Sequence, residues 1–233
     1  MMSSKIQSEA ELVKLLASGL KRNFNTDIAV QEFAGGYGIA DLVFAKNFLT
    51  NQNIIDRKPL NNYYALKSYL SLPQNKAFTL NDIVKASGGG KNIGSNVANI
   101  LTFDDYISKH GKFYYKTDVP LVNPIKKLVA IEVKLRDWKQ GILQARRYKS
   151  YTDECYLAIL SRYEKNVDKH YLTQFGIGLI LFNEENGEIW IKHKPLKKSL
   201  VSIYDEVIGL FAKELFLYES STVQNLRSIS FQV

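Results

Sequence analysis

The chain has 233 residues, of which 45% are apolar and 23% are charged, so its composition excludes a wholly disordered protein. The single cysteine, Cys155, excludes both a disulfide framework and a cysteine-rich zinc module. No apolar run approaches the roughly 18 residues that span a bilayer, and the first residues lack the apolar core of a signal peptide. We therefore expect a cytoplasmic protein with no membrane partner.

The chain is basic, with 31 Lys and Arg residues against 23 acids and a formal net charge of +8. A positive field favours polyanionic partners because neutralising phosphates releases counterions, although a basic protein with no such partner has the same composition. The segment 126–149 is locally basic around the acids Glu132 and Asp137. Its basic residues are Lys126, Lys127, Lys134, Arg136, Lys139, Arg146, Arg147 and Lys149.

The spacing of apolar residues predicts a helix over 7–22, capped by Ser8, because leucines recur there every four residues. Strands are predicted over 27–33 and 39–45, separated by a glycine-rich turn at 34–38.

The segment 58–120 differs in character from its surroundings. Helices are predicted over 60–72, 79–86 and 92–104, followed by two short strands within 106–115 around a basic turn. This order resembles a winged helix-turn-helix, which would read DNA with its third helix and touch phosphates with its wing. The candidate DNA-binding residues here are Lys91, Asn92, Ser95, Asn96, Asn99, Lys109 and Lys112. Alternatively, the module packs on the rest of the chain or forms a protein contact.

An α/β pattern follows the predicted insert. Strands are predicted over 128–134 and 155–160, helices over 138–151 and 163–175, and a strand pair over 176–182 and 188–193 around an Asn-Gly turn. The amphipathic helix predicted over 200–218 could form a homodimer contact, but we favour a role in covering the core. We expect the last dozen residues to form a loosely held tail.

Three charged residues on the predicted strands suggest a site for chemistry. In a strand over 128–134, side chains alternate between faces, so Glu132 and Lys134 share one face. Asp41 lies near the start of an earlier strand, after the glycine-rich turn. Each feature alone is compatible with an exposed charge ladder or a turn residue, but two carboxylates on adjacent strands would suit a hard cation such as Mg²⁺.

Two further sets of residues extend this pattern. Gln144 and Tyr148 are four residues apart and share one face of the predicted helix over 138–151. Glu9 lies one turn before the first buried leucines of the N-terminal helix, where a carboxylate is also favoured by the helix dipole.

Together, Glu9, Asp41, the Glu132-Val133-Lys134 motif and the 144–148 segment resemble the PD-(D/E)XK, or restriction-endonuclease-like, nuclease superfamily. The resemblance covers residues 7–57 and 121–195. Ala40 stands where the family pattern usually has proline, and the segment between Asp41 and Glu132 is longer than the pattern expects. An insertion explains this length. The resemblance implies an α/β fold with a mixed β-sheet core formed by residues 1–57 and 121–233, interrupted by a winged-helix-like domain at 58–120.

The resemblance also implies a Mg²⁺- or Mn²⁺-dependent endonuclease acting on double-stranded DNA. Asp41 and Glu132, with the Val133 carbonyl, would be metal ligands, and Lys134 would orient the attacking water. Glu9 and Gln144 would complete the catalytic set. The candidates for phosphate contacts in the core are Arg136, Lys139, Arg146 and Arg147.

The sequence leaves two alternatives open. The protein could be a non-catalytic DNA-binding regulator in which the winged helix works on a nuclease-like scaffold. It could also be a nuclease acting on RNA or on branched DNA, because the same metal site serves many phosphodiesters.

Overall fold

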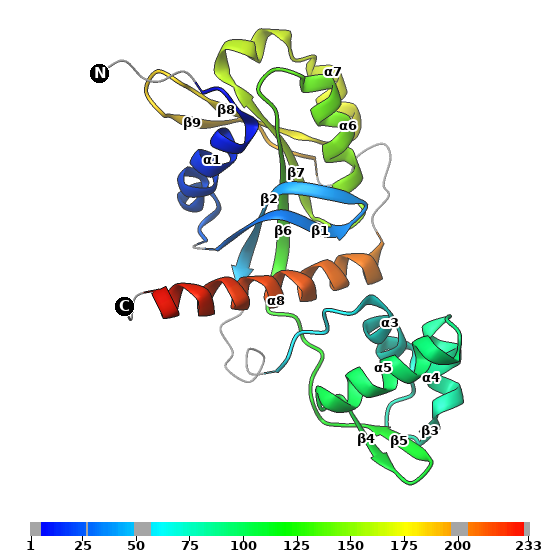
Figure 1. Cartoon of the computed structure of the whole chain (residues 1–233). Coiled ribbons are helices and arrows are strands. Elements are labelled where there is room, and N and C mark those ends of the chain that lie inside the picture. The colour runs from blue at the N-terminus through cyan, green and yellow to red at the C-terminus, as the bar shows by residue number, and fades with distance from the viewer. Residues whose placement is uncertain (1–5, 27, 49–56, 197–204, 231–233) are drawn as a thin grey trace. The chain divides into compact units, whose positions relative to one another are not determined.

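A computed structural model describes residues 6–26, 28–48, 57–196 and 205–230. The chain divides into two compact units, one formed by Met1–Leu49 with Ile125–Val233 and the other by Thr50–Pro124. The insert predicted at 58–120 lies inside the second unit. The colour gradient in Figure 1 shows that the first unit is built from both ends of the chain.

The first unit is organised around a six-stranded mixed sheet with the order β1-β2-β6-β7-β8-β9. Neighbouring strands are antiparallel except for β6–β7 and β7–β8, which are parallel. This arrangement confirms the predicted mixed α/β class. The strands are β1 (Ala29–Gly36), β2 (Gly38–Phe48), β6 (Ile125–Val133), β7 (Glu154–Leu160), β8 (Gly178–Phe182) and β9 (Ile189–His193).

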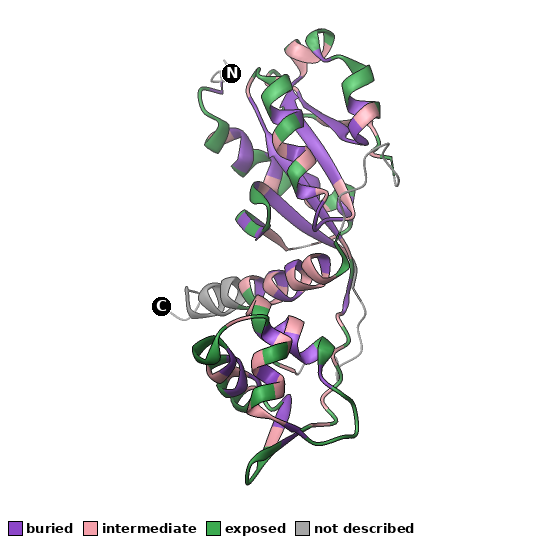
Figure 2. Cartoon of the chain, turned by 90° about the vertical axis from the view of Figure 1, so that its right-hand side faces the viewer, coloured by how far each residue is buried: buried purple, intermediate pink, exposed green. Residues whose placement is uncertain are grey.

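Helices cover both faces of this sheet (Figure 1). Helix α1 (Glu9–Phe24) packs on one face, which we call the α1 face. The opposite face, which we call the α6 face, is covered by α6 (Trp138–Tyr148), α7 (Lys169–Phe175) and α8 (Glu206–Ser230). Because both faces are covered, the central strands are buried on both sides, as Figure 2 shows.

Local sequence explains the main elements of this unit. Leu12, Leu16 and Leu20 recur at helical spacing and are fully buried, and the Ser8 side chain accepts a hydrogen bond from the Glu11 amide at the start of α1. At the start of α6, the Asp137 side chain accepts from the Gln140 amide. These caps fix where both helices begin.

In its described residues, 57–124, the second unit has three helices and a small antiparallel sheet with the order β3-β5-β4. Thr79 and Asp82 form a reciprocal capping box at the start of its second helix. Gly111 turns the β4–β5 hairpin with a positive φ of 61°. The elements are α3 (Tyr63–Ser71), β3 (Phe78–Thr79), α4 (Leu80–Ser87), α5 (Lys91–Phe103), β4 (Ile107–His110) and β5 (Phe113–Lys116).

Several sequence-based predictions are corrected by the structure. The helix predicted over 163–175 is two elements, a 3₁₀ helix η1 (Ser161–Asn166) and α7, because Asp168 caps a new helix by accepting from the His170 amide. The tail expected at the C-terminus is part of α8, which continues to Ser230. The first part of the helix predicted over 200–218 lies outside the described residues. Strand β3 was not predicted, because two residues give no periodicity.

Among the described residues, no helix combines the length and the apolar character that crossing a bilayer requires.

Candidate active site

The strand register brings Asp41 and Glu132 together across the β2–β6 pair. Leu42 pairs with Ile131 in this antiparallel ladder, so the next position along places Asp41 opposite Glu132. Residues that face each other in an antiparallel pair share one face of the sheet, with Cβ atoms about 5 Å apart. Both side chains therefore lie on the α6 face.

Glu132 is held by two donors and is almost completely buried, with 1% of its surface exposed. Its Oε1 lies 2.7 Å from Lys134 Nζ, and its Oε2 accepts from the Tyr148 hydroxyl at 2.5 Å. The same hydroxyl lies 2.7 Å from the carbonyl oxygen of Ile39. Tyr148 thus ties α6 to both β2 and β6 at the site.

Asp41 is half-buried and is fixed by the backbone of the neighbouring strand. Its Oδ2 accepts a hydrogen bond of 2.6 Å from the Val133 amide. One carboxylate oxygen of Asp41 is thereby oriented, whereas no hydrogen bond to Oδ1 is found among the described residues. This oxygen can serve an incoming ligand.

Glu9 reaches the end of β6 from the α1 face. Its Oε2 lies 3.3 Å from Lys134 Nζ, and its Oε1 accepts from the Leu135 amide at 3.4 Å. The Glu9 side chain is 47% exposed, against 10% for Lys134. Lys134 consequently lies between two carboxylates, one buried and one at the surface.

Burial dominates the electrostatics of the acidic pair. Desolvation raises the pKa of Glu132 above its ordinary value, although hydrogen bonds from Lys134 and Tyr148 offset part of the effect, and Asp41 adds to the rise. Desolvation likewise raises the pKa of Asp41 in spite of the Val133 amide and the Lys134 ammonium. The pair therefore binds protons more tightly than isolated carboxyls do.

Lys134 responds in the opposite way to its surroundings. Burial alone would lower its pKa, but the neighbouring Glu132, Glu9 and Asp41 carboxylates outweigh burial and raise the pKa above the ordinary lysine value. The Lys134 amine is therefore fixed as an ammonium beside the acidic pair.

Gln144 lies on α6 one turn before Tyr148. Its Oε1 is buried and has no hydrogen-bond partner among the described residues. A buried amide oxygen without a partner is costly, so this atom is available to accept a hydrogen bond from a water or a ligand.

Two residues here could hold a hard cation, namely Asp41 and Glu132. In the described part of the chain, no group of three or more His, Cys, Asp or Glu side chains is placed to hold a metal. A cation between these two carboxylates would draw its remaining ligands from water, backbone or a bound phosphate, as Mg²⁺ commonly does. The Val133 side chain packs in the core on the α1 face, and its amide is used by Asp41. A metal contact by the Val133 carbonyl stays a prediction.

Four residues on α6 or just before it are predicted to contact phosphates. Arg136, Lys139 and Arg147 are exposed and can meet a ligand. Arg146 is half-buried, and its guanidinium carbon lies 4.9 Å from the centroid of the Phe175 ring. Part of the Arg146 side chain thus packs on α7.

The candidates in the second unit are mostly exposed. On α5, the buried residues Gly94, Val97, Ala98 and Leu101 define the inner face, which leaves a polar outer face. This outer face carries Lys91, Asn92, Ser95, Asn96 and Asn99, of which Ser95 alone is half-buried. Lys109 on β4 and Lys112 in the following turn are exposed.

Sequence reasoning gave no role to two groups that the structure places at the site, the Tyr148 hydroxyl and the Ile39 carbonyl. Tyr148 had a visible signal, because it shares a helix face with Gln144 and follows the strand that carries Glu132. The Ile39 carbonyl had none, because its contact depends on how α6 packs on β2.

Comparisons of this chain with models of protein families, with curated proteins and with solved structures give no match.

Proposed function

We propose that this protein is a Mg²⁺-dependent nuclease that hydrolyses phosphodiester bonds in DNA. The observation that carries the proposal is the placement of Asp41 opposite Glu132, with Lys134 Nζ 2.7 Å from Glu132. Two acids and an ammonium at the end of neighbouring strands suit phosphoryl chemistry because they can hold a cation and stabilise negative charge on phosphate. The resemblance of the Glu132-Val133-Lys134 motif to PD-(D/E)XK nucleases supports the same assignment.

The residues present fit a divalent cation. No hydrogen bond to Asp41 Oδ1 is found in the described part of the chain, and burial raises the pKa of both acids, so a cation would relieve the cost of ionising them. Asp41 and Glu132 would hold this ion. A bound Mg²⁺ lowers the pKa of its coordinated water and neutralises charge on the phosphate.

The chain's own groups then have distinct tasks. Lys134 would hold the attacking water and stabilise charge on the phosphate, while Glu9 and Tyr148 orient Lys134 and Glu132 respectively. The Gln144 amide would accept from a water in this shell. Arg136, Lys139 and Arg147, which are exposed, would contact the DNA backbone.

We also propose a fold for each unit. The first unit would be a restriction-endonuclease-like core, and the second would be a winged helix. Three helices followed by a β4–β5 hairpin that pairs with the short β3 strand support this. The polar outer face of α5 would enter a DNA groove, where asparagine can read adenine, and Lys109 and Lys112 would contact phosphates.

A second candidate is a non-catalytic DNA-binding protein. It is favoured by the two donors, Lys134 and Tyr148, that already occupy both oxygens of Glu132. A nuclease for RNA or branched DNA is a variant of the first proposal, because the site itself carries no group that distinguishes these substrates.

A cleavage panel tests the proposal. Linear duplex, single-stranded and branched DNA and RNA are incubated with the full chain, with Mg²⁺ or with EDTA. We expect cleavage of DNA that requires Mg²⁺ and falls at least 100-fold in Asp41→Asn and Glu132→Gln, while Glu185→Gln, an exposed acid, cleaves normally. Binding without cleavage of any substrate would instead support the non-catalytic candidate.

A further inference from the structure

A cavity lies in the first unit, apart from the acidic pair. It has a volume of about 620 Å³, within the range of pockets that hold small molecules. Lys46 on β2 and Lys127 on β6 line it. Each of these lysines is five residues from the acid on its own strand, Asp41 or Glu132. An odd separation on a strand places side chains on opposite faces, and five residues span about 17 Å, so this cavity is on the α1 face and distant from the candidate active site.

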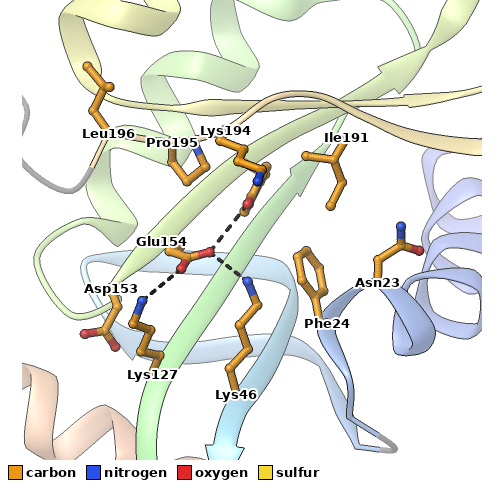
Figure 3. A pocket seen from close by; sticks show the side chains of 11 residues that line it. Asn23, Phe24, Lys46, Lys127, Asp153, Glu154, Ile191, Lys194, Pro195 and Leu196 are labelled. Atoms are coloured by element: carbon orange, nitrogen blue, oxygen red, sulfur yellow. Dashed lines mark hydrogen bonds and ion pairs between the residues drawn. The ribbon is translucent and has the colours of Figure 1, made fainter.

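One wall of the cavity is cationic (Figure 3). Lys46 and Lys127 are directly opposite each other in the β2–β6 ladder, an arrangement that is unfavourable for like charges. Glu154 lies between them, with its oxygens 2.8 Å from Lys46 Nζ and 3.3 Å from Lys127 Nζ. A third lysine, Lys194, reaches the cavity from the segment after β9.

The cationic wall retains excess positive charge. One carboxylate, Glu154, serves two ammonium groups, and Lys194 has no ion pair within the described parts of the chain. The cavity's other acid, Asp153, is already engaged, because its Oδ2 accepts from the Leu128 amide at 2.8 Å and lies 3.7 Å from the Nζ of a lysine on α8. An anion is therefore the ligand that this wall favours.

Apart from Asn23, the other residues that line the cavity are apolar or aromatic, and they include two aromatic rings. The centroids of the Phe24 and Tyr156 rings are 5.7 Å apart, with an angle of 50° between the planes, and Ile191 lies beside them. Lys46 Nζ lies 4.4 Å from the Phe24 centroid, so the cationic and aromatic surfaces meet at this ring. A ligand that fills the cavity would meet cationic groups on one side and apolar side chains on the other. Phe24 and Tyr156 are each only 3% exposed, so most of the apolar contact would come from Ile191, Pro195 and Leu196.

We propose that this cavity binds a small organic phosphate whose body packs on apolar side chains, such as a nucleoside monophosphate. The phosphate would be held by Lys127 and Lys194 beside Lys46, and the base would lie against the apolar side of the cavity, formed by Ile191, Pro195 and Leu196 next to Phe24 and Tyr156. The proposal does not depend on the nuclease assignment, because the two sites share no residue.

Calorimetric titration of the full chain, in EDTA, tests this proposal with AMP, GMP, CMP and UMP as ligands and with inorganic phosphate and adenosine as comparators. We expect at least one monophosphate to bind. Both comparators should bind at least tenfold more weakly, because inorganic phosphate lacks the base and adenosine lacks the phosphate. Lys194→Gln should weaken binding fivefold or more. Lys165→Gln, an exposed lysine on η1, should change it less than twofold.

Lys194 is exposed and unpaired among the described residues, so its replacement leaves the fold intact, which circular dichroism verifies. Asp41→Asn should bind the monophosphate like the wild type. The proposal is overturned if no monophosphate binds at millimolar concentration, if inorganic phosphate binds equally well, if Lys194→Gln and Lys165→Gln behave alike, or if Asp41→Asn abolishes binding.

Discussion

Lys134 Nζ lies 2.7 Å from Glu132 Oε1, and the side chains of these two residues are only 10% and 2% exposed. A buried ion pair is costly to form but costlier to break, because the remaining charge has no partner. Replacing one residue of this pair should therefore cost more stability than replacing both together.

We expect Lys134→Met to lower the free energy of unfolding by about 3 kcal/mol, because it leaves Glu132 buried without its cation. The double variant Glu132→Gln/Lys134→Met should be more stable than Lys134→Met alone. Urea unfolding of the wild type, both single variants and the double variant measures this coupling. Additive effects of the two changes would show that the pair is not coupled.

Replacing Asp41 should stabilise the protein in a pH-dependent way. Burial raises the pKa of Asp41, so the folded chain binds this proton more tightly than the unfolded chain does, and stability is lost as the pH rises above about 4. Asp41→Asn removes this cost and can still accept from the Val133 amide. We expect its Tm to exceed the wild-type value by about 2–4 °C at pH 8, equivalent to roughly 1 kcal/mol, and the gap to narrow toward pH 4.

The control for this experiment is Glu185→Gln, which changes an exposed acid and should leave Tm unchanged at every pH. A gap between Asp41→Asn and the wild type that widens as the pH falls would contradict the assigned direction of the pKa.

The Tyr148 hydroxyl should contribute to stability as well as to the site. Tyr148→Phe removes the donor to Glu132 and the contact with the Ile39 carbonyl, and leaves the buried Oε2 of Glu132 without this donor. We expect a loss of about 1–3 kcal/mol in the free energy of unfolding. Tyr171→Phe, which alters a 43% exposed tyrosine on α7, should cost less than 0.5 kcal/mol, roughly the limit for surface changes. Equal effects in chemical denaturation would rule out this role for Tyr148.

Period-two alternation predicted that Glu132 and Lys134 share a face, whereas the pairing of Asp41 with Glu132 was a hypothesis that depended on the family resemblance, because alternation does not give the order of the strands. The contacts that hold the pair could not be predicted from the sequence. The Glu9–Lys134 ion pair joins residues from the two sides of the sheet, and the Tyr148–Ile39 contact depends on a side chain meeting a backbone carbonyl. Such contacts follow from packing distances, which periodicity does not encode.

The predicted boundaries of one helix were wrong for a similarly local reason. Apolar spacing runs through the segment 163–175, but Asp168 supplies a cap that begins a new helix within it. Capping by a single acid competes with helix continuation, and a periodic pattern cannot decide between them.

If the second unit binds DNA as proposed, its two exposed hairpin lysines should contribute through phosphate contacts. We expect Lys109→Gln/Lys112→Gln to weaken duplex binding and to reduce the slope of log K against log salt by about two, one for each lost contact. The matched control is Lys76→Gln/Lys85→Gln, which removes two exposed lysines elsewhere in the same unit. Fluorescence anisotropy at several salt concentrations measures both quantities, and identical slopes for the two variants would exclude the hairpin from the interface.

Electron paramagnetic resonance of Mn²⁺ binding, in the presence of a short DNA duplex, tests most directly whether Asp41 and Glu132 jointly hold a divalent ion. The account predicts that the wild-type chain binds Mn²⁺, that Mg²⁺ competes for the site, and that Asp41→Asn and Glu132→Gln each weaken binding at least tenfold while Glu185→Gln does not. Wild-type affinity in both site variants, or no Mn²⁺ binding by the wild type, would contradict it.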